Sequence, residues 1–391
     1  MTVAVIRNDE GKGSLETALE LCNGLSNLKS TDKVLLKPNL VIGGHKSQRP
    51  DGVVTTTNMI EWIIDILRDY GISDITIGDG GVIHREINLN TLRAYEWSGV
   101  GPLAQKLGIE TLDLNKGPFT TVDFDGIPIK IATSILEADF VINMPVLKTH
   151  QLTKVSLGLK NLKGCMANQS KKNFHRNGLE ESIALLGTKI TTDLTIIDGT
   201  FGLQRGPVGN DAHRFDLIIA GKDVAEVDAI GAYILGLDPR EVIHLHKFYE
   251  LQGKELDLSK IEVKGEQLGK VRHPLEWVSH WPQELMEAYN IKGVKMDTPG
   301  YSNCSGCGMG IFVAVNNFFR QHRNTTFNDV EICVGREPVA SPDAKKVFCL
   351  GKCACDTNKD HPNAIKIGGC PPSVKRSQEV LEKELCSQVN D

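Results

Sequence analysis

Segments typical of strands and helices alternate along residues 1–250, and this alternation constrains the fold more than any other feature of the chain. Apolar runs of strand length end at polar or glycine-containing turns, and amphipathic stretches with helical spacing separate them. The run 140–144, for example, is followed at once by Pro145. Strands separated by helices of this length predict an α/β fold, with a mostly parallel, doubly wound sheet covered by helices on both faces.

The same pattern divides the chain into three predicted parts. Residues 1–251 form the α/β body, in which 119–124 and 128–132 around Asp-Gly predict a β-hairpin. Residues 252–297 contain scattered glycines, prolines and mixed charges, which predict an irregular connecting region. Residues 298–391 predict a smaller C-terminal α/β module that is rich in cysteine and binds a cluster.

Polar residues follow the apolar strands of the body. In open parallel sheets ligands bind outside the carboxyl ends of the strands, so these residues are expected to share one site. We expect a threonine at a helix start, close to the same edge, to add hydroxyl and amide donors. The predicted substrate-binding residues are Lys37, Asn39, Thr56, Asp79, Lys160, Asn161 and Asp198, and the predicted catalytic residues are Lys148, His150 and His175.

The residue types in this pocket indicate its chemistry. Lys37, Lys148 and Lys160 would make it strongly positive, so we expect a small anionic substrate with a carboxylate or phosphate group. A lysine crowded by like charges has a lowered pKa and can act as a base. His150 and His175 are proton-transfer candidates because histidine titrates near neutrality. Each residue also has an ordinary interpretation, as a charged strand end or a structural hydrogen-bonding group.

Other parts of the body carry weaker signals. The loop 206–209 contains two glycines and suits a close approach of the backbone to another group. His84 lies in a polar stretch, where we expect it to be solvated. The chain contains neither a Gly-x-Gly-x-x-Gly turn nor a Gly-Lys-Ser/Thr phosphate loop.

The ten cysteines are concentrated near the C-terminus. Cys22 and Cys165 precede residue 300, where we expect them to pack in the core, and the other eight follow it. The N-terminus lacks the charged and apolar regions of an export signal, so we expect a cytoplasmic protein with reduced thiols rather than disulfides.

A Cys-x-x-Cys pair and two distant cysteines in glycine-rich turns predict a metal centre. We expect Cys304, Cys307, Cys353 and Cys370 to bind one [4Fe-4S] cluster, with Cys349 or Cys355 as alternatives to Cys353. Zn is the alternative metal, because four thiolates also make a tetrahedral zinc site. The remaining two, Cys333 and Cys386, are interpreted as bystanders.

Several motifs of the body resemble the family called domain of unknown function 362. They are residues 37–40, 141–150, 158–161 with Gly164, His175, 197–199 and 206–209, and the resemblance covers roughly residues 1–250. The C-terminal cysteine motifs resemble an extension found in some members, whereas many members instead carry clustered Cys-x-x-Cys repeats of the ferredoxin type. The resemblance implies an iron-sulfur protein of mostly anaerobic organisms, without a settled reaction.

Three function classes follow from these features. The favoured one is an oxidoreductase that acts on a small anionic substrate, with one [4Fe-4S] cluster as the electron relay and a redox partner such as a ferredoxin. The second is an electron-transfer or accessory protein without its own substrate chemistry. The third is a non-redox enzyme with a structural zinc site. The net charge of −5 argues against nucleic-acid binding, and no apolar run is long enough for a membrane span, while the oligomeric state stays open.

Overall fold

The computed structural model describes residues 1–42, 51–124, 126–296 and 304–386 and divides into two compact units. The first unit, here called the body, comprises Met1–Val82 and Leu89–Trp277. The second, here called the C-terminal unit, comprises Ile83–Asn88 and Val278–Asp391. A short piece of chain from the first hundred residues therefore belongs to the C-terminal unit. We describe each unit by itself.

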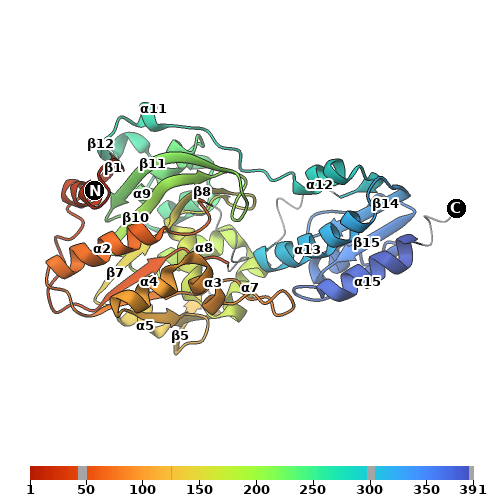
Figure 1. Ribbon diagram of the computed structural model, residues 1–391, viewed down its shortest axis with the longest axis horizontal. Coiled ribbons are helices and arrows are strands. Elements are labelled where there is room, and N and C mark those ends of the chain that lie inside the picture. Colours follow the sequence, from red (N-terminus) through yellow and green to blue (C-terminus); the bar gives the residue numbers. More distant parts are fainter. Residues whose placement is uncertain (43–50, 125, 297–303, 387–391) are drawn as a thin grey trace. The chain divides into compact units, whose positions relative to one another are not determined.

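The body is built on one ten-stranded sheet (Figure 1). Its strands, in sheet order, are β12 (Glu262–Gly265), β1 (Thr2–Arg7), β11 (Ala212–Gly221), β10 (Leu194–Leu203), β7 (Phe140–Met144), β2 (Val34–Pro38), β3 (Ile75–Asp79) and β4 (Glu110–Asp113), with β8 (Val146–His150) beside β10 and β9 (Lys154–Val155) beside β8. Among the described strands of this sheet, the antiparallel pairs are β1 with β11, β10 with β11, and β8 with β9. The predicted α/β fold with a mostly parallel sheet is therefore confirmed.

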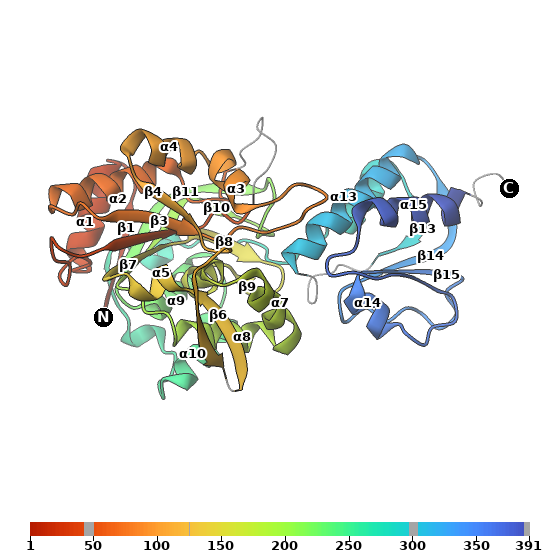
Figure 2. The same ribbon diagram turned by 90° about the horizontal axis from the view of Figure 1, so that it is seen from below.

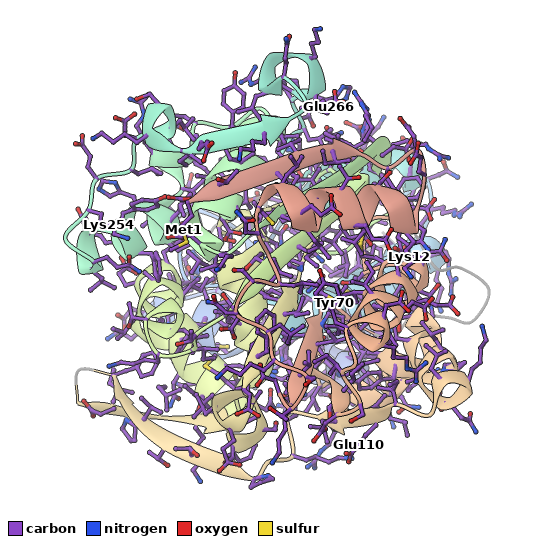
Figure 3. All side chains as sticks on the ribbon, turned by 90° about the vertical axis from the view of Figure 1, so that its left-hand side faces the viewer. Met1, Lys12, Tyr70, Glu110, Lys254 and Glu266 are labelled. Atoms are coloured by element: carbon purple, nitrogen blue, oxygen red, sulfur yellow. The ribbon has the colours of Figure 1, made fainter. Side chains whose placement is uncertain are left out.

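Helices cover both faces of this sheet, as expected for a doubly wound fold. One face packs against α1 (Lys12–Leu21), α2 (Thr57–Asp69), α3 (Thr91–Ser98) and α4 (Val100–Leu107), and the other against α6 (Gly158–Asn161), α8 (Leu179–Gly187), α9 (Val224–Ile234) and α10 (Ile243–Leu251). In α2, Ile60, Ile63 and Leu67 are all fully buried, because their spacing places them on one side of the helix. Figure 3 shows the body from the side on which Lys12 of α1 and Tyr70, the C-cap of α2, are labelled. Lys12 pairs with Asp69 of α2 at 2.6 Å.

Smaller elements complete the body. The predicted hairpin is present as the antiparallel pair β5 (Phe119–Phe124) and β6 (Ile127–Ala132), which packs beside the main sheet (Figure 2). The other helical segments are α5 (Thr133–Glu137), α7 (Asn168–Asn177), α11 (Leu268–Val271) and three 3₁₀ turns at Leu162–Cys165, Pro239–Glu241 and Leu258–Lys260.

The stretch after Pro145 differs from the prediction. The sequence suggested a strand that stops at Pro145 and leads into a polar segment, but Val146–His150 forms a second strand, β8, and every residue of it is buried. The ten residues of β10 extend past the end of β7, and their free backbone groups pair with β8. Lys148 and His150 therefore lie inside the body, on a strand.

The C-terminal unit is a four-stranded parallel sheet with helices. Its strands, in sheet order, are β13 (Lys292–Lys295), β14 (Thr326–Val334), β15 (Lys346–Leu350) and β16 (Ala364–Ile367), and its helices are α12 (Trp281–Tyr289), α13 (Ser305–Gln321), α14 (Lys352–Thr357) and α15 (Val374–Leu385). The core lies between the sheet, α13 and α15.

The predicted connecting region, residues 252–297, is divided between the two units. It contains β12, which pairs with β1 in the body, and also α12 and β13 of the C-terminal unit. The division falls between Trp277 and Val278. Among the described residues, no helix is both long and apolar enough to cross a membrane.

Candidate functional site

A buried ion pair lies at the carboxyl ends of β2 and β3. The Nζ atom of Lys37 is 2.8 Å from Oδ1 of Asp79, and both side chains are almost completely buried. The Asp79 carboxylate also accepts hydrogen bonds from the backbone amides of Leu40 and Gly80. A buried carboxylate needs such partners, because burial without them is costly. The geometry therefore assigns Asp79 to fix Lys37 and the chain that follows β2.

Asn161 of α6 links this ion pair to the rest of the predicted site. Its Oδ1 atom accepts from Nζ of Lys37 at 3.3 Å and from Nδ2 of Asn39 at 3.0 Å. Its Nδ2 group donates to Oδ1 of Asn143 at 2.8 Å. Lys37, Asp79, Asn39 and Asn161 were predicted as site residues from sequence. Asn143 was not, because a polar residue inside an apolar strand gives no signal of its partners.

Lys148 extends the network from β8. Its Nζ group donates to Oδ1 of Asn39 and, at 2.9 Å, to the carbonyl of Val53, with a longer contact of 3.5 Å to the carbonyl of Pro207. Burial lowers the pKa of Lys148 to about 7, with Asp79 opposing and Lys37 adding to that effect. Lys148, Asn39, Asn161, Lys37 and Asp79 thus form one continuous chain of hydrogen bonds.

The predicted close approach of the 206–209 loop is also present. A Cβ atom added at Gly206 would lie 2.4 Å from the carbonyl oxygen of Thr149, which is far inside contact distance. The glycine therefore permits the loop to lie against β8, where the Pro207 carbonyl reaches Lys148.

Thr56 and Asp198 lie beside this network but bind each other. The backbone amide and the hydroxyl of Thr56 both donate to Oδ2 of Asp198 at 2.8 Å. The other carboxylate oxygen accepts from the amide and hydroxyl of Thr200. The donors at the start of α2 are thus occupied by a carboxylate of the chain itself.

A group of cations surrounds His150. Burial, followed by the charges of Lys160, Lys163, Lys148 and His175, lowers the pKa of His150 well below its ordinary value. His150 is therefore neutral at physiological pH. Its Nδ1 atom accepts from the amide of Leu152 at 3.0 Å, which places the imidazole proton on Nε2. His150 is suited to donate a hydrogen bond from Nε2 rather than to act as a base through Nδ1.

Two further cations of this group are partly exposed. Lys160 and Lys163 are both intermediate in burial, as is His175 on α7. Nζ of Lys163 lies 3.1 Å from Nε2 of His175. Burial, with the charges of Lys163 and Lys148, lowers the pKa of Lys160 well below its ordinary value. The structure therefore brings all three predicted catalytic residues together with Lys160 and adds Lys163. We call Lys148, His150, Lys160, Lys163 and His175 the basic site.

Asp228 positions this site and was not predicted. It is fully buried on α9, and its carboxylate accepts from the amides of Gly158 at 2.6 Å and Leu159 at 2.8 Å, at the start of α6. Burial raises the pKa of Asp228 to about 7. Because α6 carries Lys160 and Asn161, Asp228 acts through the backbone of that helix.

Replacing Asp228 by alanine is expected to destabilise the body. Two buried amides would lose their acceptor, at a cost of about 1–3 kcal/mol each. Urea unfolding of Asp228→Ala should therefore show a lower free energy of unfolding than the wild type. Asp69→Ala removes an exposed carboxylate and serves as the control, since surface ion pairs contribute little. Equal losses for the two variants would contradict the role given to Asp228.

Lys171 is a second residue that the sequence did not reveal. Its Nζ group donates to the carbonyl of Gly80 at 2.7 Å and to Oδ1 of Asn115 at 2.8 Å. Burial lowers the pKa of Lys171 to about 8, while Asp79 opposes this shift. On sequence alone it lies in a polar helix next to Lys172, where an exposed charge is the ordinary interpretation.

The predicted cluster ligands lie at the starts of helices or just after strands of the C-terminal unit. Cys353 lies in the first turn of α14, directly after β15, and Cys370 follows β16 and precedes α15. Cys304 is the N-cap of α13, and Cys307 lies in the first turn of that helix. The N-terminus of a helix favours negative charge, so these positions suit thiolates.

The four sulfur groups influence one another. A hydrogen bond with Cys304, then burial, then the charges of Cys304, Cys370 and Cys353 raise the pKa of Cys307 well above its ordinary value. Thiols in this situation ionise together when a metal supplies compensating positive charge.

The spacing of these sulfur atoms bears on the kind of metal centre. Zn–S bonds of about 2.3 Å in tetrahedral geometry would place the sulfur atoms about 3.8 Å apart. Among the described residues, no three of the four cysteines have sulfur atoms within 4.8 Å of one another. A [4Fe-4S] cluster places its four thiolates on four different irons, which requires wider spacing. Four cysteine thiols are a donor set that both a [4Fe-4S] cluster and a zinc ion can use.

Three other cysteines form a separate group. Cys333 and Cys349 are buried on adjacent strands, and the Sγ atom of Cys355 contacts the carbonyl of Cys349 at 3.4 Å. Burial, then the charges of Cys333 and Cys355, raise the pKa of Cys349 to about 12. Cys353 lies close enough to Cys307 for its charge to act on that thiol. Cys349 and Cys355, the predicted alternatives to Cys353, are grouped with Cys333 instead.

His84 lies inside the C-terminal unit, so the prediction that it is solvated is wrong. It is 3% exposed, and neither ring nitrogen has a hydrogen-bond partner among the described residues. A Cβ atom added at Gly310, three residues after Cys307, would lie 2.5 Å from Nε2 of His84. Two residues later, Glu86 accepts from the amides of Val374 and Lys375 at the start of α15. These contacts hold residues 83–88 against α13 and α15.

Comparisons with known proteins concern mainly the body. The family model described as "Domain of unknown function (DUF362)" matches residues 34–233. The thylakoid-associated protein sll1697 of Synechocystis is 29% identical over 237 residues, which are 59% of this chain and 71% of that protein. The lactate racemase apoprotein of Thermoanaerobacterium thermosaccharolyticum is 14% identical, with a TM-score of 0.41, over 60% of this chain and 57% of that one. This chain thus spans less than two thirds of that enzyme.

Proposed function

This chain belongs to the family described as Domain of unknown function (DUF362), and we propose that it is an iron-sulfur oxidoreductase acting on a small anionic substrate. In this proposal Cys304, Cys307, Cys353 and Cys370 hold one [4Fe-4S] cluster, which supplies or accepts single electrons. The basic site of the body binds the carboxylate or phosphate group of the substrate. A ferredoxin-like protein serves as the redox partner.

One observation carries the cluster part of the proposal. Three sulfur atoms, those of Cys304, Cys353 and Cys370, lie close enough to Cys307 to oppose its ionisation. Four thiols at the starts of helices and the ends of strands are costly to ionise unless a cationic centre binds them. A [4Fe-4S] cluster, which binds four thiolates, would supply such a centre.

The charge balance of the body supports an anionic substrate. Lys160 lies near the like charges of Lys163 and Lys148, which outweigh the opposing carboxylate of Glu180, and Lys148 is fully buried. Mutual repulsion and burial are unfavourable for the protonated lysines, and a bound anion would relieve both. A pure electron carrier has no need for such a site.

The proposed roles of these residues in anion binding follow from how deeply each one is buried. Lys160, Lys163 and His175 would contact the anion, because these residues are less buried than Lys148 and His150. The Nε2 proton of His150 would donate a hydrogen bond to it. Lys148 has its Nζ donors directed to Asn39 Oδ1 and two backbone carbonyls, so it would act on the anion through its charge. Transfer of a proton would fall to the Lys163–His175 pair, which lies at 3.1 Å.

Electron transfer to small anions tests this function. Anaerobically purified protein is mixed with reduced viologen and a panel of small carboxylates and phosphate esters, and viologen oxidation is followed. We expect at least one class of anion to accelerate oxidation, and Lys160→Met to remove that acceleration while leaving the visible absorption of the cluster intact. If no anion accelerates oxidation, while the protein still passes electrons to a ferredoxin, the protein is a carrier and the enzymatic proposal fails.

The pH dependence of anion binding follows from the lysine pKa values. The folded pKa of Lys148 is lowered to about 7, and that of Lys160 is also lowered, so a bound anion should raise both and take up protons. Sulfate, whose charge is constant in this range, should bind more weakly as the pH rises through about 7. Calorimetry in buffers of different ionisation enthalpy measures the proton uptake directly. Binding that is independent of pH, with no proton uptake, would contradict the site.

A further inference from the structure

A second group of metal-ligand side chains lies in the C-terminal unit, apart from the four predicted cluster ligands. His322 is the C-cap of α13, Glu382 lies on α15, and Cys386 is the C-cap of α15. Glu382 and Cys386 are four residues apart, so the helix places them on one side. Cys386 was interpreted as a bystander from sequence, because its partner His322 is 64 residues away in the chain.

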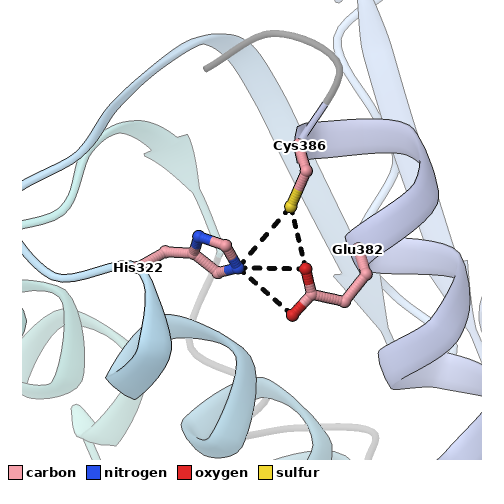
Figure 4. Close-up of side chains that lie close together, drawn as sticks. All are labelled: His322, Glu382 and Cys386. Carbon is pink, nitrogen blue, oxygen red and sulfur yellow. Dashed lines mark hydrogen bonds and ion pairs between the residues drawn. The ribbon is translucent and has the colours of Figure 1, made fainter. Parts of the chain in front are cut away.

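The three ligand atoms converge on a common point (Figure 4). Nε2 of His322 lies 3.1 and 3.0 Å from the two carboxylate oxygens of Glu382. Sγ of Cys386 lies 2.8 Å from Oε2 of Glu382 and 3.6 Å from Nε2 of His322. All three atoms lie within 4.8 Å of one another. Among the described residues, no other group of three histidine, cysteine, aspartate or glutamate side chains meets that limit.

We propose that His322, Glu382 and Cys386 bind a zinc ion through three protein ligands, with a fourth position open. Zinc takes imidazole, carboxylate and thiolate ligands in tetrahedral geometry. The distance of 3.6 Å between sulfur and nitrogen is close to the separation of two ligands around one zinc ion, about 3.5 Å. The ligand set also selects the metal, because thiolate disfavours magnesium and calcium.

Charge balance supports a divalent ion. A neutral His322, the Glu382 carboxylate and a Cys386 thiolate carry a total charge of −2, which zinc would neutralise. Burial and the nearby Glu382 carboxylate raise the pKa of the Cys386 thiol to about 11. Zinc binding would release that proton, as thiol ligands generally do.

The surroundings are compatible with an accessible metal. The His322 side chain is 20% exposed and that of Glu382 is 38% exposed. Glu382 also lines a cavity of about 630 Å³ between α13 and α15, together with Phe318, Arg320 and Gln321. The His322 ring packs on Phe318, with ring centres 4.5 Å apart, which limits its rotation. The pattern of three protein ligands and solvent access is typical of zinc sites that exchange a ligand, rather than of closed structural sites.

Metal titration of the full-length protein tests the site. The anaerobically purified protein is stripped of weakly bound metal, its iron content is recorded, and Zn²⁺ and Co²⁺ are titrated into separate samples. We expect one equivalent to bind, and Co²⁺ to give the thiolate charge-transfer band of a tetrahedral site. His322→Ala, Cys386→Ser and Glu382→Gln should each weaken binding by more than about 100-fold, since loss of an outer partner alone costs about 10–100-fold.

Controls separate this site from the cluster and from misfolding. Glu379→Gln changes a neighbouring exposed carboxylate on α15 and should bind zinc like the wild type. The iron content should be unchanged in all four variants, so a failure of the cluster assignment is visible independently. The proposal is overturned if the wild type and all three ligand variants bind zinc with the same stoichiometry and affinity. Loss of binding in Glu379→Gln as well would equally exclude the triad as the site.

Discussion

Anaerobically purified Cys304→Ser protein is expected to be colourless, whereas the wild type is expected to be brown with visible absorption that bleaches on reduction. Serine cannot replace a thiolate as a soft ligand to iron, and each of the four cysteines binds one iron of the proposed cluster. Cys370→Ser should have the same result, because its sulfur also acts on Cys307. Visible absorption and iron content measure the loss.

Two cysteine variants serve as matched controls. Cys22→Ser changes a thiol that is 4% exposed in the core of the body, and it should keep the colour of the wild type. Cys355→Ser tests the ligand assignment, because the structure groups Cys355 with Cys333 and Cys349. A colourless Cys355→Ser protein beside a brown Cys353→Ser protein would show that the ligand set is wrong.

Lys160→Met is expected to cause the largest loss of anion binding in the body. This change removes the ammonium group of Lys160, a residue of intermediate burial, while keeping a side chain of similar length. A hydrogen bond to a charged group contributes about 1.5–3 kcal/mol, which corresponds to roughly a 10–100-fold weaker Kd for sulfate. Isothermal titration calorimetry at a pH below 7 measures the difference, because Lys148 is then protonated in both proteins.

An exposed lysine provides the comparison for this variant. Lys116, whose side chain is 77% exposed, pairs with Asp113 in the same unit. Lys116→Met removes the same charge and should change sulfate affinity little. If the two variants lose affinity equally, the effect comes from net charge and the basic site is not the binding site.

The fold of the body was predictable because its signals are local. The apolar run 140–144 is β7, and the glycine-bounded turns fall where strands end. Strand ends of a parallel sheet converge by topology, so Lys37, Asn39 and Asp79 could be grouped before any distance was known. Family membership, which was also predicted, is confirmed by the match over residues 34–233.

The residues that were missed depend on contacts distant in sequence. Asp228 lies in an apolar helix and shows its function only through two amides that are about seventy residues away. His84 appears polar and exposed in sequence, but residues 83–88 pack against helices formed more than two hundred residues later. Strand β8 was missed because Pro145 normally ends a strand, whereas here the longer β10 offers a second partner.

Metal and acid-labile sulfide analysis of the anaerobically purified protein decides whether the four cysteines hold a [4Fe-4S] cluster. We predict about four iron and four sulfide ions per chain, held in the wild type and in Cys386→Ser, and lost in Cys304→Ser. The cluster assignment would be contradicted if the protein contains no iron or sulfide but holds one zinc ion that Cys386→Ser retains and Cys304→Ser loses. The four cysteines would then form a zinc site, and the protein would have no iron-sulfur chemistry.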